Sequence, residues 1–235
     1  KLEYSKNGFL DETQTFLIVA STPADPLPTD NAGTYAWTVA DAIGTALKIR
    51  ASDADNATVS DVSNTNFTIK GSLTLTAPNG AEIWRVGESR NVTWTKVGTI
   101  ATVKLEYSTN GGTTYPNVII ASTDATTGTY AWTVPDAIGT LLRVRITNTA
   151  DATVFDDSNA NFEVKGSVTV TAPNGAEVWV VNSSQNLTWT RTGTFADVKL
   201  EYSKNAFADE LQTTVITAAT PADPLPTDNA GTYAW

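Results

Sequence analysis

Apolar and polar residues alternate along most of this chain with a period of two, in short runs. In the stretch RNVTWTK, Val92 and Trp94 share one face of an extended strand, and Asn91, Thr93 and Thr95 share the other. This alternation is typical of a strand with one face on a core and the other in solvent. No segment has the apolar spacing of a long amphipathic helix. The pattern therefore predicts an all-β protein.

Seven such runs fall between residues 71 and 165, each bounded by Gly, Pro, Asn or Asp. They cover Ser72–Thr76, Arg90–Lys96, Thr102–Ser108, Asn117–Ser122, Gly128–Val134, Leu141–Thr147 and Asn161–Lys165. Seven short strands in about 95 residues are typical of a β-sandwich. Trp94 and Trp132 lie on the apolar phase of their runs, so we expect them to be the central packing residues.

Internal repeats organise the whole chain. The string KLEYS begins at three positions spaced 103 and then 95 residues apart, and GTYAW begins at three positions spaced 95 and then 103 apart. The difference arises between the two strings, where the outer copies contain TPADPLPTDNAG and the middle copy contains TDATTG. We call the outer copies long units and the middle copy the short unit. We expect the loop Thr22–Gly33 to be the sole feature that separates the two types.

The two unit types together form a super-repeat of 198 residues. Residues 1–37 and 199–235 match at 30 of 37 positions. One strand pattern gives way to the next at Gly71 and again at Gly166, where we place the domain joints. This predicts the C-terminal part of one domain at 1–70, a complete domain at 71–165, and the N-terminal part of another at 166–235. We therefore expect a window on a longer repeat polypeptide, with one-residue linkers that hold neighbouring domains in a nearly fixed relation.

The amino-acid composition excludes most kinds of catalytic and metal site. The chain has 235 residues, a formal net charge of −10, and no Cys, Met or His. Without thiolate or imidazole there is no disulfide, no Cys or His zinc site and no His-dependent nucleophile. Only a carboxylate pair, as in glycoside hydrolases, remains as enzyme chemistry. The acidic residues fall on outward phases or in turns, so we expect no enzyme and no cofactor. The acidic balance also disfavours nucleic acid and anionic membranes, and no apolar run is long enough to span a bilayer.

Residues 71–165 contain a set of motifs, parts of which recur in the flanking units: APNGAE-x-W, a strand ending in TWT, VKLEYS-x-NGG, GTYAWTVPD, and a closing strand after D-x-SNANF. The set resembles bacterial and archaeal extracellular immunoglobulin/fibronectin type III-like repeats with a PNGGE-x-W signature, a family related to a Ser-Thr-rich module of yeast cell-wall proteins. The resemblance covers essentially the whole chain and implies tandem seven-stranded Ig/fibronectin type III-like β-sandwich domains outside a prokaryotic cell. This chain departs from the signature at Ala81 and Ala176, which replace Gly, and keeps Asn-Gly-Gly only in the short unit.

Two groups of residues are candidates for metal or ring contacts. Acidic residues cluster before the last strand of two units, and their oxygens could bind Ca²⁺ near a joint, although Asp is also common in turns and no EF-hand spacing is present. These weak calcium candidates are Asp53, Asp55, Asp61, Asp151, Asp156 and Asp157. Trp84 and Trp179 follow the APNGAE turn, where the alternation breaks. An exposed ring there could stack on a sugar or a neighbouring domain, but packing against its own sandwich end or the adjacent domain is favoured.

The remaining candidate sites are acceptors for glycans and a loop that could contact other copies of the chain. Five Asn-x-Ser/Thr sequons are candidate glycan acceptors: Asn56, Asn66, Asn91, Asn182 and Asn186. The loop of the long units contains Pro23, Pro26 and Pro28. It is either a stiff surface loop or a contact that repeats once per 198 residues.

These observations favour a structural protein: tandem sandwiches that form a long extracellular rod or filament on a prokaryotic cell surface. Its partners would be adjacent domains, other copies of the chain and possible glycans. The alternatives are an adhesin or carbohydrate-binding stalk, and spacer modules of a secreted enzyme.

Overall fold

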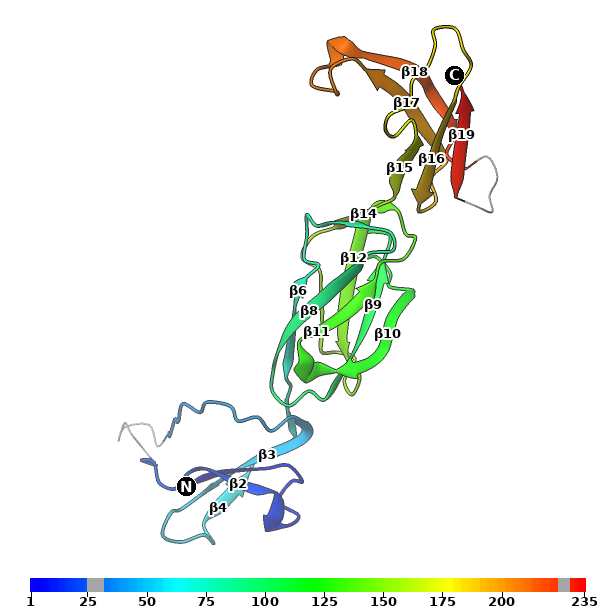
Figure 1. Cartoon of the computed structure of the whole chain (residues 1–235). Helices are drawn as coiled ribbons and strands as arrows, with labels where there is room; N and C mark the ends of the chain where they lie inside the picture. Colours follow the sequence, from blue (N-terminus) through cyan, green and yellow to red (C-terminus); the bar gives the residue numbers. More distant parts are fainter. Residues whose placement is uncertain (25–31, 224–228) are drawn as a thin grey trace.

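The computed structural model describes residues 1–24, 32–223 and 229–235. Its strands fall into three groups that follow the chain, with the N-terminus and the C-terminus at opposite ends of an elongated molecule (Figure 1). Apart from short 3₁₀ turns, the regular structure of the described residues consists of strands, so the fold is all-β as predicted.

The middle unit is a complete β-sandwich, and the structure describes all of its residues. One sheet has the strand order β10-β9-β12-β14-β7, with β13 also paired to β12, and the other has the order β11-β8-β6. The bounds are β6 (Ser72–Ala77), β7 (Ile83–Arg85), β8 (Ser89–Val97), β9 (Thr102–Ser108), β10 (Asn117–Asp124), η2 (Ala125–Thr127), β11 (Thr129–Thr133), β12 (Gly139–Asn148), β13 (Phe155–Asp157) and β14 (Phe162–Lys165).

All seven predicted strands of this unit are present, and two short strands are added. We had placed Trp84 after a broken alternation, but it lies in β7, which pairs in parallel with β14. Asp156 and Asp157, expected in the connection before the last strand, lie in a strand of their own, β13, which is an antiparallel partner of β12. Three-residue strands are too short to show a period of two, which is why the alternation did not reveal them.

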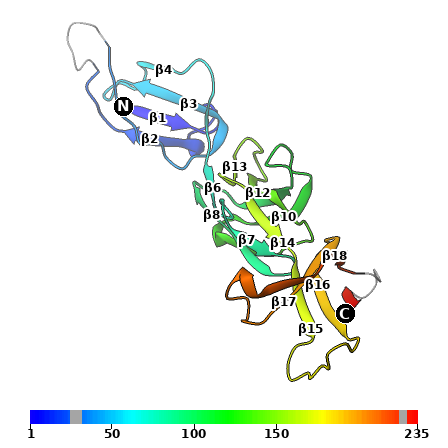
Figure 2. The same ribbon diagram turned by 90° about the horizontal axis from the view of Figure 1, so that it is seen from above.

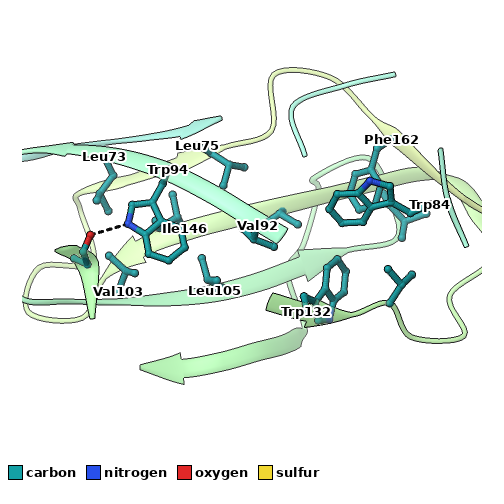
Figure 3. Packing of buried hydrophobic residues seen from close by; sticks show 14 of the residues in the cluster. Leu73, Leu75, Trp84, Val92, Trp94, Val103, Leu105, Trp132, Ile146 and Phe162 are labelled. Atoms are coloured by element: carbon teal, nitrogen blue, oxygen red, sulfur yellow. Dashed lines mark hydrogen bonds between the residues drawn. The ribbon is translucent and has the colours of Figure 1, made fainter. Parts of the chain in front are cut away.

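The core of the middle unit lies between its two sheets. Trp94 is 3 % exposed, and its indole Nε1 donates a hydrogen bond to the carbonyl of Ala125 at 3.0 Å (Figure 3). At the other end of the core, Trp84 packs against Trp132 and Phe162 with ring centroids 5.9 and 5.0 Å apart. Each buried Trp contributes about 2 to 3 kcal/mol of hydrophobic stabilisation, so these rings fix both ends of the sandwich.

The first unit contains one of the two sheets. Among its described residues, β2-β1-β3-β4 pair in that order and β5 joins β3. The strands are β1 (Leu2–Ser5), β2 (Thr15–Val19), β3 (Gly44–Ser52), β4 (Ser60–Val62) and β5 (Phe67–Ile69), with η1 at Glu12–Gln14. Residues 34–38 correspond to β11 but form no strand. Because β11 pairs with β8 alone, a segment without a β8 counterpart has no ladder to join.

The third unit contains the N-terminal strands of the sandwich and shares with the first unit the hairpin that follows KLEYS. β15 (Ser167–Ala172), β16 (Asn186–Thr192) and β19 (Ala230–Ala234) form one sheet, and β17 (Asp197–Ser203) pairs with β18 (Thr213–Pro221) after η3 (Glu210–Gln212). Trp189 repeats the role of Trp94, since its Nε1 donates to the carbonyl of Ala222 at 2.9 Å. Figure 2 shows this unit from above, beside β7 and β14 of the middle unit.

The loop Thr22–Gly33 is not the sole difference between unit types, which corrects our expectation. The hairpin tips of both long units contain a 3₁₀ turn, η1 or η3, that the tip between β9 and β10 does not have. Asp11 and Asp209 cap these turns by accepting hydrogen bonds from backbone N–H groups. Between KLEYS and GTYAW a long unit has eight more residues than the short unit. Two of them lie in the hairpin that follows KLEYS, and six lie in the Thr22–Gly33 loop or its equivalent.

Candidate functional site

The same pair of hydrogen bonds links neighbouring units at both junctions. Before β3, Asp41 accepts from the backbone N–H of Thr99 at 3.1 Å and from its hydroxyl at 2.5 Å. Before β12, Asp136 accepts from the N–H and hydroxyl of Thr194 at 3.0 and 2.5 Å. Both Asp residues are separated by 95 positions, as are both Thr residues. We call this arrangement the Asp–Thr clamp. Charge-assisted bonds of this kind are the stronger class of hydrogen bond.

The clamp at the first junction also lowers the pKa of its own carboxyl group, Asp41. The hydroxyl and the backbone N–H of Thr99 lower the pKa of Asp41 below its ordinary value of 3.8. The charged form that accepts both hydrogen bonds is therefore stabilised.

An apolar contact accompanies each clamp. Ile43 of the first unit packs against the core of the middle unit. A Cβ on Gly98 would lie 3.1 Å from Cδ1 of Ile43, and a Cβ on Gly193 would lie 3.0 Å from Cδ1 of Ile138. Both glycines have positive φ, +85° and +91°, and they therefore combine a backbone conformation and a close approach that a side chain would prevent.

The linker glycines are confined by the unit that follows them. A Cβ on Gly71 would lie 2.6 Å from the carbonyl oxygen of Val97, and a Cβ on Gly166 would lie 2.7 Å from that of Thr192. Ile100 and Phe195 pack against the same two glycines. Two residues separate β5 from β6 and one separates β14 from β15, and the glycine of each short connection is packed on the unit that follows.

The first junction has a further contact. Lys70 Nζ lies 3.3 Å from Oδ2 of Asp151 in the turn between β12 and β13, and it also donates to the hydroxyl of Thr153. This ion pair joins the end of the first unit to the middle unit.

Sequence reasoning missed the clamp. Asp41 and Asp136 sit in the strings VADAIGT and VPDAIGT, and Thr99 and Thr194 in VGTI and TGTF. The alternation pattern and the motifs single out none of the four residues. The available signal was the recurrence of both partners at the same offset of 95 on either side of each predicted joint.

The calcium candidates do not come together as a ligand set. Asp53 caps the backbone N–H of Asp55, and Asp151 accepts from Thr153. Asp156 accepts from the N–H of Leu75 on β6, and Asp157 pairs with Arg145 at 2.7 Å. Asp61 lies in β4. Within residues 1–24, 32–223 and 229–235, no group of three or more acidic side chains is placed to hold a metal.

The two equivalent tryptophans differ in environment. Trp84 is 6 % exposed in its own core, so its ring is not available to a sugar or a neighbouring unit. Trp179 is half-buried and contacts Trp235 edge-on at 6.1 Å. All five sequon asparagines, Asn56, Asn66, Asn91, Asn182 and Asn186, are exposed. Pro23 is exposed as well, whereas Pro26 and Pro28 lie outside the described residues.

A hollow of about 830 Å³ lies in the first unit between β1, β3, β4 and residues 33–35. Asp53, Asp61 and Pro23 line it. The counterpart of Asp61 in the middle unit is Asp156, which binds the backbone of β6. β6 packs against β12 and β13 there, so the middle unit fills the equivalent space with a strand of its own.

No protein-family model matches this chain, and no curated protein matches it. Among solved structures, the chain is similar to the fibronectin(III)-like modules of CbhA from Clostridium thermocellum. The two are 19 % identical, the match covers 69 % of this chain and 77 % of that chain, and the TM-score is 0.26. The β-sandwich fold of this chain is defined by the two sheets of its middle unit. No helix in the described part of the chain is long and apolar enough to cross a membrane.

Proposed function

We propose that this chain is a structural segment of a long extracellular rod or filament on a prokaryotic cell surface. Its units would be β-sandwich domains joined at Gly71 and Gly166. The work of each domain would be to hold the next one at a fixed angle and distance.

The repetition of the Asp–Thr clamp carries this proposal. Asp41–Thr99 joins a long unit to the short one, and Asp136–Thr194 joins the short unit to a long one, with the same atoms in contact. A flexible tether between binding domains needs no such contact. A contact that recurs at successive joints is what a rod of defined shape requires, because each joint must repeat the same rotation.

The surface is consistent with an extended protein that stays dispersed. Most outward side chains of β6, β8 and β11 are short and carry a hydroxyl group, although the exposed Val97 and Ala131 lie on the same faces. The short polar ones are Ser72, Thr74, Thr76, Asn91, Thr93, Thr95, Thr129 and Thr133. The edge strand β10 is irregular, with two register shifts against β9, and bulged edges resist strand addition by other chains.

We also propose that the chain has no catalytic role. A carboxylic acid that donates a proton in catalysis needs a raised pKa. Among the described residues, the carboxyl groups with a clearly shifted pKa are shifted downward by hydrogen bonds or cations, as at Glu3, Asp11, Asp41, Glu88, Asp124, Asp151 and Glu177.

Electron microscopy of a tandem array tests the proposal. The 198-residue super-repeat would be joined head to tail in several copies, with a matched array in which both clamp aspartates are replaced by Asn. We expect straight particles whose length grows by a constant increment per unit, and a broader distribution of bends in the variant array. Flexible wild-type particles that bind on a glycan array would favour the stalk, and flexible particles without binding would favour spacer modules.

A further inference from the structure

The five sequons of the chain are not equivalent as glycan acceptors. Asn56 and Thr58 are exposed and lie in the turn between β3 and β4, at the end of the first unit that faces away from the middle unit (Figure 1). The carbonyl of Asn56 accepts a hydrogen bond from the N–H of Val59 at 3.0 Å, which closes the turn. An exposed turn is the setting in which an Asn-x-Ser/Thr sequence can be reached by a transferase.

The side chains of this sequon are held together. Oδ1 of Asn56 accepts hydrogen bonds from the N–H and the hydroxyl of Thr58 at 3.2 and 2.6 Å. In the part of the chain that the structure describes, Nδ2 of Asn56 donates to no partner. A glycan is attached through this nitrogen. The turn therefore orders the amide oxygen and the hydroxyl and leaves the reacting atom free.

Two of the other sequons lie inside three-stranded sheets. Asn91 is in β8, between β6 and β11, and Asn186 is in β16, between β15 and β19. The hydroxyls of these sequons, on Thr93 and Thr188, each form a hydrogen bond at 2.7 Å to a threonine of the neighbouring strand. A transferase binds the acceptor segment in a groove of its own, and a strand paired on both sides can enter it only after local unfolding.

The remaining two sequons do not have the geometry of the Asn56 turn. The two residues after Asn66 lie in β5, and one of them, Phe67, packs against the core of the first unit. Asn182 is followed by Ser183, whose hydroxyl donates to the carbonyl of Val180 at 2.7 Å. Among the described residues, no hydrogen bond joins either asparagine to the hydroxyl of its own sequon.

The short unit has the same turn without the acceptor. Asp151 stands at the position equivalent to Asn56, and its Oδ1 accepts from the N–H and the hydroxyl of Thr153 at 3.0 and 2.6 Å. A carboxylate has no nitrogen to which a glycan could be attached. One super-repeat, residues 1–198, therefore contains one copy of this turn that can accept a glycan and one that cannot.

We propose that Asn56 is an N-glycosylation site, so that the rod carries a glycan once per super-repeat, on its long units. The donor is a polyprenyl-diphosphate-linked glycan. The bond between Nδ2 and the sugar C1 forms, the bond from C1 to the diphosphate oxygen breaks, and the Nδ2 proton passes to a carboxylate of the transferase. This proposal rests on the extracellular location in the proposed function, because the modification takes place on exported chains.

Glycan transfer to the folded full chain tests it. The probe is a polyprenyl-diphosphate-linked disaccharide, used with a purified single-subunit oligosaccharyltransferase that requires only Asn-x-Ser/Thr. Mass spectrometry of proteolytic peptides gives the occupancy of each site over time. Synthetic peptides centred on each sequon give the transfer rate without the fold. The ratio of the rate in the chain to the rate in the peptide isolates the effect of the structure.

We expect this ratio to be at least about tenfold higher at Asn56 than at Asn91 or Asn186, because transfer to a paired strand waits for local unfolding. Asn56→Gln should remove the first glycan to appear. The double variant Asp151→Asn with Lys70→Gln should gain a second glycan, at position 151, because it restores the amide and removes the lysine that donates to Thr153.

Three results would overturn the proposal: equal ratios at Asn56 and the strand sequons, a first glycan at any of the other four asparagines, or no gain at position 151 in the double variant. The transfer uses purified components and does not depend on the clamp. Its failure would therefore leave the rod function standing, and a failed tandem-array measurement would leave the acceptor turn standing.

Discussion

The guanidinium of Arg191 contacts the carboxylate of Asp223 at 2.9 Å, and 11 % and 3 % of the two side chains are exposed. Arg191 also donates to the carbonyls of Gly193 and Phe195, which belong to the second junction. The equivalent residue of the short unit is Lys96, which donates only to the carbonyl of Gly98. The longer loop of a long unit is therefore tied by one buried ion pair to the turn that contacts the preceding unit.

Replacing Asp223 by Asn should release this loop. The change leaves the Arg191 charge buried without its partner, and breaking a buried pair in this way costs about 3 kcal/mol or more. Exchange of the Ala222 N–H, which binds the carbonyl of Ala196 at 2.9 Å, measures the local effect. The matched change Lys96→Gln in the short unit should cost about 1 kcal/mol or less, since it removes a single hydrogen bond. Equal effects of the two variants would contradict this account of the loop.

The equivalent tryptophans should respond differently to truncation. Trp84→Ala removes a ring packed between Trp132 and Phe162, and we expect a loss of about 3 to 5 kcal/mol in the free energy of unfolding of the middle unit. Trp179→Ala removes a half-buried ring and should cost about 1 kcal/mol in the third unit. Urea unfolding followed by amide exchange in each unit compares the two. A similar small loss at both positions would show that Trp84 is not a core residue.

Ala81 should be more stable as glycine. Its φ is +66°, in the left-handed region that costs a residue with a Cβ about 1 kcal/mol. Ala81→Gly is therefore expected to stabilise the middle unit by up to about 1 kcal/mol. Ala176, the equivalent residue of the third unit, does not have a positive φ, so Ala176→Gly should be neutral or destabilising. The contrast between the two variants, measured by denaturant unfolding, is the test, and a destabilised Ala81→Gly would refute it.

The middle unit should lose stability at high pH through Tyr115. Burial of the phenol, together with the nearby charge of Asp157, raises the pKa of Tyr115 to about 12 from 10.0. The folded state therefore resists ionisation longer than the unfolded chain. The stabilising effect is complete below pH 10 and is lost as the pH rises through about 12. A titration of tyrosinate absorbance should show a late-ionising component that shrinks in Tyr115→Phe, while Tyr107, whose pKa burial also raises, still ionises above the ordinary range. The absence of a late step in the wild type would be the contrary result.

Alternation and repeats were sufficient to predict the class of fold and every long strand of the middle unit. They could not show β7, because Ile83–Arg85 is too short for a period and is defined by its parallel partner β14. The GTYAW string forms β11 in the middle unit, yet residues 34–38, which include most of the same string, form no strand in the absence of a β8 counterpart. A short strand forms only where a partner strand is present to hydrogen-bond with it. The residues of one segment alone do not show whether that partner exists.

The candidate site was harder to predict for the same reason. Asp41 and Thr99 are 58 residues apart in the chain, and each alone is a common turn residue. Trp84 was expected after the APNGAE turn, packed either on its own sandwich end or on the adjacent domain, and the contact with Phe162 from another strand decides between the two. The sequence predicts joints at Gly71 and Gly166, but the contacts across them are visible only when the two sides are brought together.

The central claim is that the Asp–Thr clamp fixes the relation of neighbouring units. Residual dipolar couplings of backbone amides in the intact chain at neutral pH, compared with Asp136→Asn, test it most directly. We predict that couplings from the middle and third units of the wild type fit one alignment tensor, and that Asp136→Asn yields two tensors of different magnitude with both units still folded. Separate tensors in the wild type, or a variant that keeps a single tensor, would contradict the account.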